Sequence, residues 1–132
     1  RFQAREMSIT STATNLGKED DVPVGDVLYQ TTGMVLDSSG DRTNTNVTEI
    51  GVKFPKERRT PFKRKFNEMR AYSRTQFRTT STVDGVYMLP WGAITDKQKG
   101  IDLRNAQVGD VSVGYTVGVG SGTIHALHYA FG

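Results

Sequence analysis

The chain has 132 residues, the length of one ordinary globular domain, and it contains no cysteine. The missing cysteine excludes a disulfide framework, a thiolate metal site and a cysteine nucleophile. Lys and Arg number 17 against 14 Asp and Glu, so the formal net charge is +3. No apolar run approaches the roughly 20 residues that a membrane helix needs, and we expect no membrane partner.

We interpret residues 1–132 as a single domain. The sequence begins at Arg1 rather than Met, so we expect an upstream segment, such as an N-terminal arm, to be absent from it.

The first part of the chain carries patterns of short strands separated by turns. Residues 7–13 alternate Met, Ile and Ala with Ser and Thr, which predicts a polar strand. Residues 27–29 and 34–36 are apolar and flank Gly33, so they form either one bent strand or two. Residues 37–46 are rich in Ser, Asp, Gly and Asn, and they predict a loop with several turns.

The middle of the chain predicts strands around one short helix. Residues 47–54 alternate as a strand with apolar residues on one face, and residues 86–89 predict a further strand. Residues 62–73 have helical spacing, whereas the overlapping residues 71–80 alternate as a strand with a basic face. Residues 96–106 are polar and suit one helical turn. The residues at helical spacing are Phe62, Phe66, Met69 and Ser73, and Pro61 suits the first turn.

The clearest strand pattern lies near the end of the chain. Residues 111–119 alternate Val and Tyr with Ser, Gly and Thr. One face of this strand therefore carries large side chains, and the other face is nearly bare. The bare face allows another backbone to approach closely. Residues 123–131 alternate in the same way after the turn at residues 120–122, and we expect the two strands to form a hairpin.

These patterns together indicate an all-β protein. We count seven or eight strands with long and irregular connections, which favour a Greek-key sandwich over a regular meander. The patterns therefore predict either a Greek-key sandwich or a jelly roll, with one or two short helices.

Positive charge gathers in residues 53–65, where Glu57 is the one acidic residue. Such a cluster binds polyanions by releasing their counterions. Two alternatives are a solvated loop and a rim that pairs with acidic residues of a neighbouring subunit, such as Glu19, Asp20 and Asp21. On the first interpretation, with the basic face of residues 71–80 added, the candidate nucleic-acid contacts are Lys56, Arg58, Arg59, Lys63, Arg64, Lys65, Arg74 and Arg78.

The sequence offers little for catalysis. The chain has two histidines, His125 and His128, and a spacing of three on one strand sends them to opposite faces. They therefore cannot join in one metal or acid–base site, and we expect neither an enzyme nor a cofactor. Asp96 and Asp102 are weak candidates for calcium at a subunit boundary, with an exposed polar loop as the simpler interpretation.

Residues 66–106 resemble the middle of the coat proteins of small icosahedral positive-strand RNA viruses, in the tombusvirus, sobemovirus and satellite-virus groups. The similarity rests on the polar turn Ser81-Thr82-Val83-Asp84-Gly85 and on the strand Val86-Tyr87-Met88-Leu89 that follows it. Residues 109–117, a glycine before alternating Val and Tyr, are similar to the late strand of that family, and Arg5-Glu6 matches the pair that opens its first strand.

This resemblance implies an all-β coat protein, a single jelly-roll (Greek-key) sandwich of about eight antiparallel strands with one or two short helices. It implies that the protein assembles with many copies of itself into an icosahedral shell. It also implies RNA packaging through sequence-independent contacts, and a location in the virion, with host cytoplasm as the place of assembly.

A second hypothesis is a β-sandwich module that binds carbohydrate or a protein partner, for example an appendage of a larger viral particle. Trp91, Tyr87 and Tyr72 are its candidate stacking platform, although a core position at the end of a strand is the simpler role for Trp91.

Overall fold

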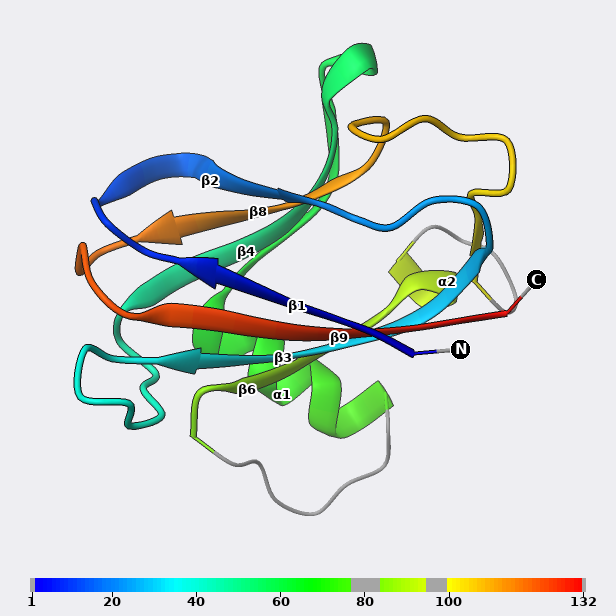
Figure 1. Cartoon of the computed structure of the whole chain (residues 1–132). Coiled ribbons are helices and arrows are strands. Elements are labelled where there is room, and N and C mark those ends of the chain that lie inside the picture. Colours follow the sequence, from blue (N-terminus) through cyan, green and yellow to red (C-terminus); the bar gives the residue numbers. More distant parts are fainter. Residues whose placement is uncertain (1, 77–83, 95–99, 132) are drawn as a thin grey trace.

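The computed structural model describes residues 2–76, 84–94 and 100–131, which form a sandwich of two antiparallel sheets (Figure 1). Sheet A contains β1 (Phe2–Ser8), β9 (Thr123–Phe131), β3 (Val27–Leu36) and β6 (Val86–Pro90), and the short β7 (Ile101–Asp102) pairs with β3. Sheet B contains β2 (Ala13–Asp21), β8 (Ser112–Val117), β4 (Val47–Phe54) and β5 (Arg59–Lys65). The helical elements are the 3-10 turn η1 (Pro55–Glu57), α1 (Phe66–Gln76) and α2 (Trp91–Ile94).

The strand order is that of a jelly roll. Sheet A has the order β1-β9-β3-β6 and sheet B has the order β2-β8-β4-β5. The chain changes sheet at most connections, and β4 and β5 are the neighbouring pair that stay together as a hairpin. This arrangement, two interleaved Greek keys, confirms the all-β jelly roll predicted from the sequence.

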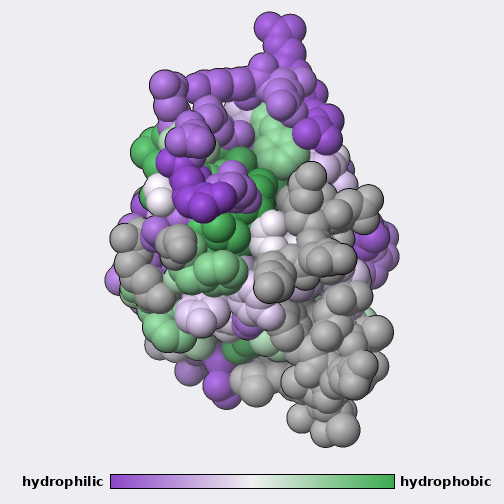
Figure 2. Space-filling model, turned by 90° about the vertical axis from the view of Figure 1, so that its right-hand side faces the viewer, coloured by the Kyte–Doolittle hydropathy of each residue, from purple (hydrophilic) through white to green (hydrophobic). Residues whose placement is uncertain are grey.

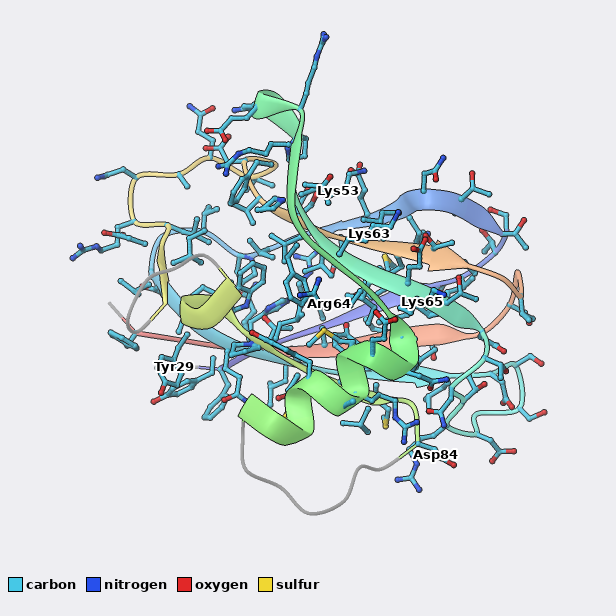
Figure 3. The ribbon with its side chains drawn as sticks, turned by 180° about the vertical axis from the view of Figure 1, so that it is seen from behind. Tyr29, Lys53, Lys63, Arg64, Lys65 and Asp84 are labelled. Carbon is cyan, nitrogen blue, oxygen red and sulfur yellow. The ribbon has the colours of Figure 1, made fainter. Side chains whose placement is uncertain are left out.

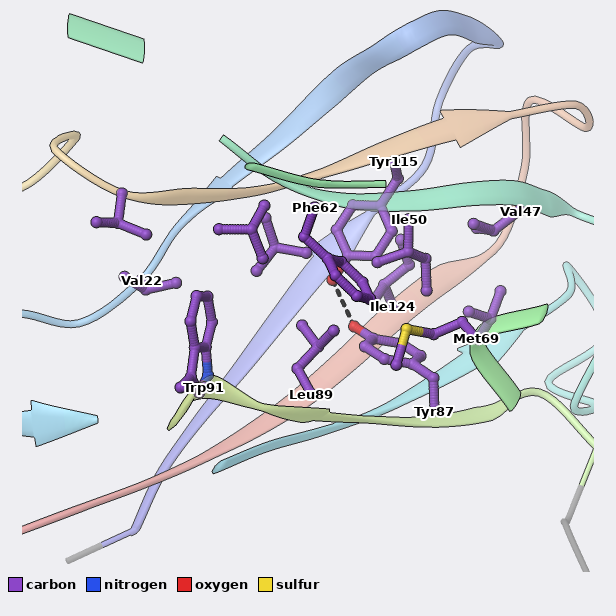
Figure 4. Packing of buried hydrophobic residues seen from close by; sticks show 14 of the residues in the cluster. Val22, Val47, Ile50, Phe62, Met69, Tyr87, Leu89, Trp91, Tyr115 and Ile124 are labelled. Carbon is purple, nitrogen blue, oxygen red and sulfur yellow. Dashed lines mark hydrogen bonds between the residues drawn. The ribbon is translucent and has the colours of Figure 1, made fainter. Parts of the chain in front are cut away.

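The core fills the space between the sheets (Figure 4). Alternate residues of the strands point inward, as a period of two requires, and Ile50, Leu89 and Val113 are among those buried there. Tyr87 of β6 and Tyr115 of β8 meet at its centre, where their hydroxyl groups hydrogen-bond. Because one tyrosine comes from each sheet, this bond ties the two layers together.

The two long sides of the sandwich are closed in different ways. On one side α1 packs against β6, β4 and β5 and buries Phe66 and Met69 in the core. On the other side, the inward-facing Arg5 of β1 binds Asp20 of β2, with Nη2 and Nε 2.9 and 3.2 Å from Oδ1. The helix thus covers the core on one side, and an ion pair joins the two sheets on the other.

The bare face predicted for residues 111–119 is present in the structure, and the segment around Leu16 lies on it. Leu16, with a positive φ of 58°, folds over the outer side of sheet B and is buried there. A Cβ at Gly114 would lie 2.8 Å from Leu16 Cβ, and one at Gly51 would meet the Leu16 side chain. The two glycines therefore make room for Leu16.

Several predicted elements are confirmed. The strand over residues 47–54 has the bounds of β4, and residues 123–131 form β9. Residues 27–29 and 34–36 belong to one strand, β3, and residues 37–46 form the expected loop with little regular structure.

Other expectations were wrong. Residues 7–13 span the end of β1, the turn after it and the first residue of β2. The last two strands are not a hairpin, because β8 pairs with β2 and β4 whereas β9 pairs with β1 and β3. Phe62 lies in β5 rather than in a helix, and residues 71–76 continue α1 instead of forming a strand.

Replacing Gly33 of β3 by alanine should destabilise the fold. Tyr87 lies against Gly33, and the added Cβ would overlap its ring, which is fully buried and hydrogen-bonded to Tyr115. We expect Gly33→Ala to lower the free energy of unfolding by about 3 kcal/mol, the upper part of the range for overpacking. Urea unfolding measures this loss.

The matched control is Gly118→Ala, whose Cβ would lie 3.3 Å from the nearest atom, Thr48 Cγ2. It should cost less than about 1 kcal/mol. Equal losses for both variants would contradict the role assigned to Gly33.

Candidate functional site

The basic segment forms a hairpin that projects from one end of the sandwich. We call residues 53–65, which comprise the end of β4, η1 and β5, the basic hairpin. Figure 2 shows its hydrophilic tip rising above the rest of the molecule. Arg58 closes the turn with a left-handed φ of 52° and donates its N–H to the oxygen of Pro55 at 3.1 Å. The cations of this segment are therefore displayed on one protruding element.

Part of this positive charge is paired with acids of the same chain. Lys56 Nζ lies 2.7 Å from Asp110 and Lys63 Nζ lies 3.5 Å from Glu49. Arg59 binds Glu57 at 2.9 Å, and Lys53 binds Glu19. The hydrogen bond from Lys56 also lowers the pKa of Asp110. Glu19, expected as part of an acidic patch for a neighbour, is instead used within the chain.

The Glu49–Lys63 pair belongs to a chain of polar contacts across the outer face of sheet B. The backbone N–H of Leu16 donates to Thr116 Oγ1 at 2.9 Å, and Thr116 donates to Glu49 at 3.0 Å. Since Glu49 in turn binds Lys63, the contacts run from β2 through β8 and β4 to β5. Lys63 therefore has a structural partner that the sequence pattern did not indicate.

Three predicted cations of the hairpin have no ion pair among the described residues: Arg58, Arg64 and Lys65. In Figure 3, Lys63 and Lys65 lie on one side of β5 and Arg64 on the other. Arg64 stacks on Phe62, with its guanidinium carbon 5.0 Å from the ring centre. Of the remaining candidates, Arg74 lies in α1, where its side chain is outside the described part, and Arg78 lies outside the described residues altogether.

The same residues also protect an edge. β5 is the last strand of sheet B among the described residues, and no described strand lies along one side of its backbone. Lys63, Lys65 and Pro61 are residue types that keep further strands from pairing with an exposed edge. The basic hairpin thus has a structural reason for its charges in addition to any role in binding.

The two histidines lie on opposite faces of β9, as predicted. His125 is half-buried on the outer face, and His128 is buried in the core. Trp91 Nε1 donates to Thr31 Oγ1 at 2.8 Å, and Thr31 Oγ1 lies 2.7 Å from His128 Nδ1. The Thr31 hydroxyl therefore accepts a hydrogen bond from Trp91 and shares a second one with His128 Nδ1. This network links β3, α2 and β9 within the core.

The prediction of an exposed aromatic stacking platform is wrong. Trp91 and Tyr87 are fully buried, so neither ring is available to a ligand. Tyr72 packs on Phe62 with ring centres 5.6 Å apart. The alternative role for Trp91, a core residue at the end of a strand, is the one observed.

The calcium candidates gain no support. Asp102 is bound through both oxygens by Arg104, at 2.9 Å from Nε and 2.7 Å from Nη2, while Asp96 lies outside the described residues. Within residues 2–76, 84–94 and 100–131, no three His, Asp or Glu side chains come together as metal ligands would. In the same part of the chain, no helix has the length and apolar character that crossing a membrane requires.

The burial of His128 makes stability depend on pH. Loss of water lowers the pKa of His128 from 6.5 to about 4, with Asp20 opposing this shift and Arg5 adding to it. The unfolded chain therefore binds a proton at this histidine more tightly than the folded chain does. The free energy of unfolding is higher by about 3 kcal/mol above pH 6.5, and this gain is lost as the pH falls to about 4.

We expect the gap in unfolding free energy between the wild type and His128→Gln to be constant above pH 6.5 and to narrow between pH 6.5 and 4. His125→Gln, which removes the histidine on the outer face of the same strand, is the matched control. A constant gap for His128→Gln over the whole range would show that the buried histidine does not titrate in this way. Urea unfolding at a series of pH values provides the measurement.

Comparisons with known proteins identify the fold type. The sequence matches no protein-family model, and no curated protein is significantly similar to it. Among solved structures, a crystal structure of the STIV MCP, a major capsid protein, superposes with a TM-score of 0.79 over 98% of this chain at 12% identity. A chain in the atomic structure of Sulfolobus Turreted Icosahedral Virus gives the same score, coverage of this chain and identity.

This chain covers 40% and 38% of those two chains, or about two fifths of their length. At this identity the likeness concerns the fold. The chain therefore has a jelly roll of the type found in a viral capsid protein.

Proposed function

We propose that this chain is a capsid-type structural protein that assembles with copies of itself into an icosahedral shell. The observation that supports this most is the superposition on the STIV MCP over 98% of the chain. The proposed role is structural rather than enzymatic. It places the protein in the virion, with assembly in the host cytoplasm, as the sequence resemblance implies.

We further propose that the basic hairpin contacts the packaged nucleic acid. Arg58, Arg64 and Lys65 have no acidic partner among the described residues, so they are free to neutralise phosphates. Contacts from these side chains to phosphates would carry no information about base sequence. RNA is the nucleic acid that the resemblance to RNA-virus coat proteins implies, and binding of this kind is sensitive to salt.

Assembly is tested by electron microscopy and sedimentation of the purified protein, with and without single-stranded RNA. We expect closed particles, since each subunit of a shell makes several contacts that are individually weak. A protein that remains monomeric at about 0.1 mM under both conditions would contradict the proposed function.

The nucleic-acid contact is tested with two variants of equal net charge. In the hairpin variant, Arg58, Arg64 and Lys65 are changed to Gln. In the control variant, Lys18, Arg42 and Arg104, which lie outside the basic hairpin, are changed to Gln. The first should reduce the slope of log affinity against log salt for single-stranded RNA by about 2, because three phosphate contacts are lost at roughly 0.7 each.

The control should leave the salt slope close to that of the wild type, because it removes charge without removing the proposed contacts. Filter binding at several salt concentrations, with two unrelated RNA sequences and one DNA duplex, measures the slopes. Equal slopes for the two variants would show that the hairpin is not the site. A strong preference for one RNA sequence would exclude the sequence-independent mode.

A further inference from the structure

The two outer faces of the sandwich differ in character. The outer face of sheet B carries the polar contacts and ion pairs described above. The outer face of sheet A instead carries a group of large apolar side chains, which we call the aromatic face: Phe2, Tyr29, Leu127, Tyr129 and Phe131. These residues come from β1, β3 and β9, which are neighbours in the sheet.

The aromatic face is exposed to an unusual degree. Phe2 is 66% exposed, while Tyr29, Leu127 and Phe131 are 41–42% exposed. The rings also contact one another: Tyr129 lies 4.8 Å from Phe2 and 5.7 Å from Tyr29, measured between ring centres. They therefore form one continuous patch rather than scattered residues. Patches of this kind mark interaction surfaces on soluble proteins.

The core does not require these side chains. In β9 the inward positions, which include Ile124, His128 and Ala130, are already buried between the sheets. A sheet with water on one side normally has polar residues there, whereas strands covered on both sides are apolar throughout. β9 is apolar on both sides over most of its second half, as a strand covered on both faces would be.

The face is shallow and almost free of charge. A groove of about 270 Å³ runs between Phe2, Tyr29, Leu127 and Tyr129, with Gln30 and Thr32 as its polar lining. Among the described strand residues that point outward from sheet A, two are charged, Glu6 and Asp102. They lie at opposite ends of the face, and Asp102 is already bound by Arg104. A partner that fits this face is itself flat and apolar.

A second copy of this chain offers such a flat, apolar surface, namely its own aromatic face. Two identical copies with a net charge of +3 repel each other, but this face keeps the basic hairpin away because the hairpin belongs to sheet B. Sheets pack face to face about 10 Å apart when both faces are apolar. A two-fold axis through such a face brings the same residues together from both copies.

The size of the face fits a contact that is weak on its own. Four strands spaced about 4.8 Å apart and about 25 Å long cover roughly 500 Å² of flat sheet. A specific interface of standard size buries about 800 Å² per partner. The contact is therefore at the small end of specific interfaces, and it is useful where many such contacts act together, as they do in a shell.

We propose that the aromatic face is an interface between two copies of this chain, with sheet A packed on sheet A about a two-fold axis. The proposal rests on the proposed function as a self-assembling protein, and it adds the surface through which two copies meet. Leu127, in the middle of the exposed stretch of β9, lies at or near the axis.

The first test changes one exposed aliphatic residue on the face and one away from it. Leu127→Glu puts a carboxylate into the face, whereas Val119→Glu puts the same charge in the turn before β9 at nearly equal exposure, 43% against 42%. By sedimentation and electron microscopy, we expect Leu127→Glu to weaken self-association at least tenfold and Val119→Glu to behave as the wild type. Thermal unfolding shows whether both variants are folded, since neither position belongs to the core.

The second test uses the absence of cysteine from the chain. Leu127→Cys gives each copy one thiol, and a bifunctional thiol-reactive crosslinker that spans about 10 Å can join two such thiols across sheets packed face to face. We expect this reagent to link most of the assembled Leu127→Cys protein into covalent dimers. Val119→Cys is the control and should remain uncrosslinked.

The outcomes separate the interface from the function. Particles that form normally with Leu127→Glu, together with Leu127→Cys that stays uncrosslinked in them, would overturn this interface while the proposed function stands. If the wild type and Val119→Glu form no oligomers at all, both proposals fail. A wild type that stays monomeric but binds soluble oligosaccharides, with binding lost in Leu127→Glu, would assign the face to a sugar instead and likewise overturn the interface.

Discussion

The separation and alignment of the two sheets depend on the hydrogen bond between Tyr87 and Tyr115. Each tyrosine reaches from its own sheet to the middle of the core, and both side chains are fully buried. Burial raises the pKa of both hydroxyls, so each keeps its proton at any physiological pH. In an apolar core a hydroxyl without a partner costs free energy, so either sheet can slide only if this bond breaks. Gly33 supports the arrangement by leaving space beside the Tyr87 ring.

With the sheets fixed in this way, each outer face acquires its own chemistry. On sheet B, Gly51 and Gly114 admit Leu16, and Thr116, Glu49 and Lys63 satisfy one another's polar groups. That face is complete without a partner. On sheet A, the outward side of β9 is aromatic and has no comparable cover among the described residues. The division places the charged hairpin and the apolar face on different sheets, so a subunit can meet nucleic acid and a second copy through separate surfaces.

Sequence reasoning succeeded where the determining forces are local. The bounds of β4 and the burial of alternate residues in β9 follow from the period of two, which needs no knowledge of the partner strand. It failed where the chain had to choose a partner. Residues 112–117 pair with β2 and β4, which lie far away in the sequence, and nothing in their alternation distinguishes these partners from the adjacent residues 123–131.

The helix was misplaced for a related reason. Phe62 and Phe66 both point into the core, and a spacing of four fits a helix as well as it fits the end of a strand followed by a first helical turn. Likewise, the sequence shows how many cations residues 53–65 contain, but not that Glu49 and Asp110 neutralise two of them. Those pairs exist because the jelly roll brings β4 and the loop before β8 beside the hairpin.

The apolar content of the chain has a consequence for how these surfaces work. Only 36% of the residues are hydrophobic, and a chain of this length needs most of them inside. Yet Phe2 is 66% exposed, and Leu127 and Phe131 are 42% and 41% exposed. A protein that functions alone gains solubility from polar residues at these positions. Apolar residues there become favourable when a second surface covers them, so their stabilising effect appears upon association rather than in the folding of the single chain.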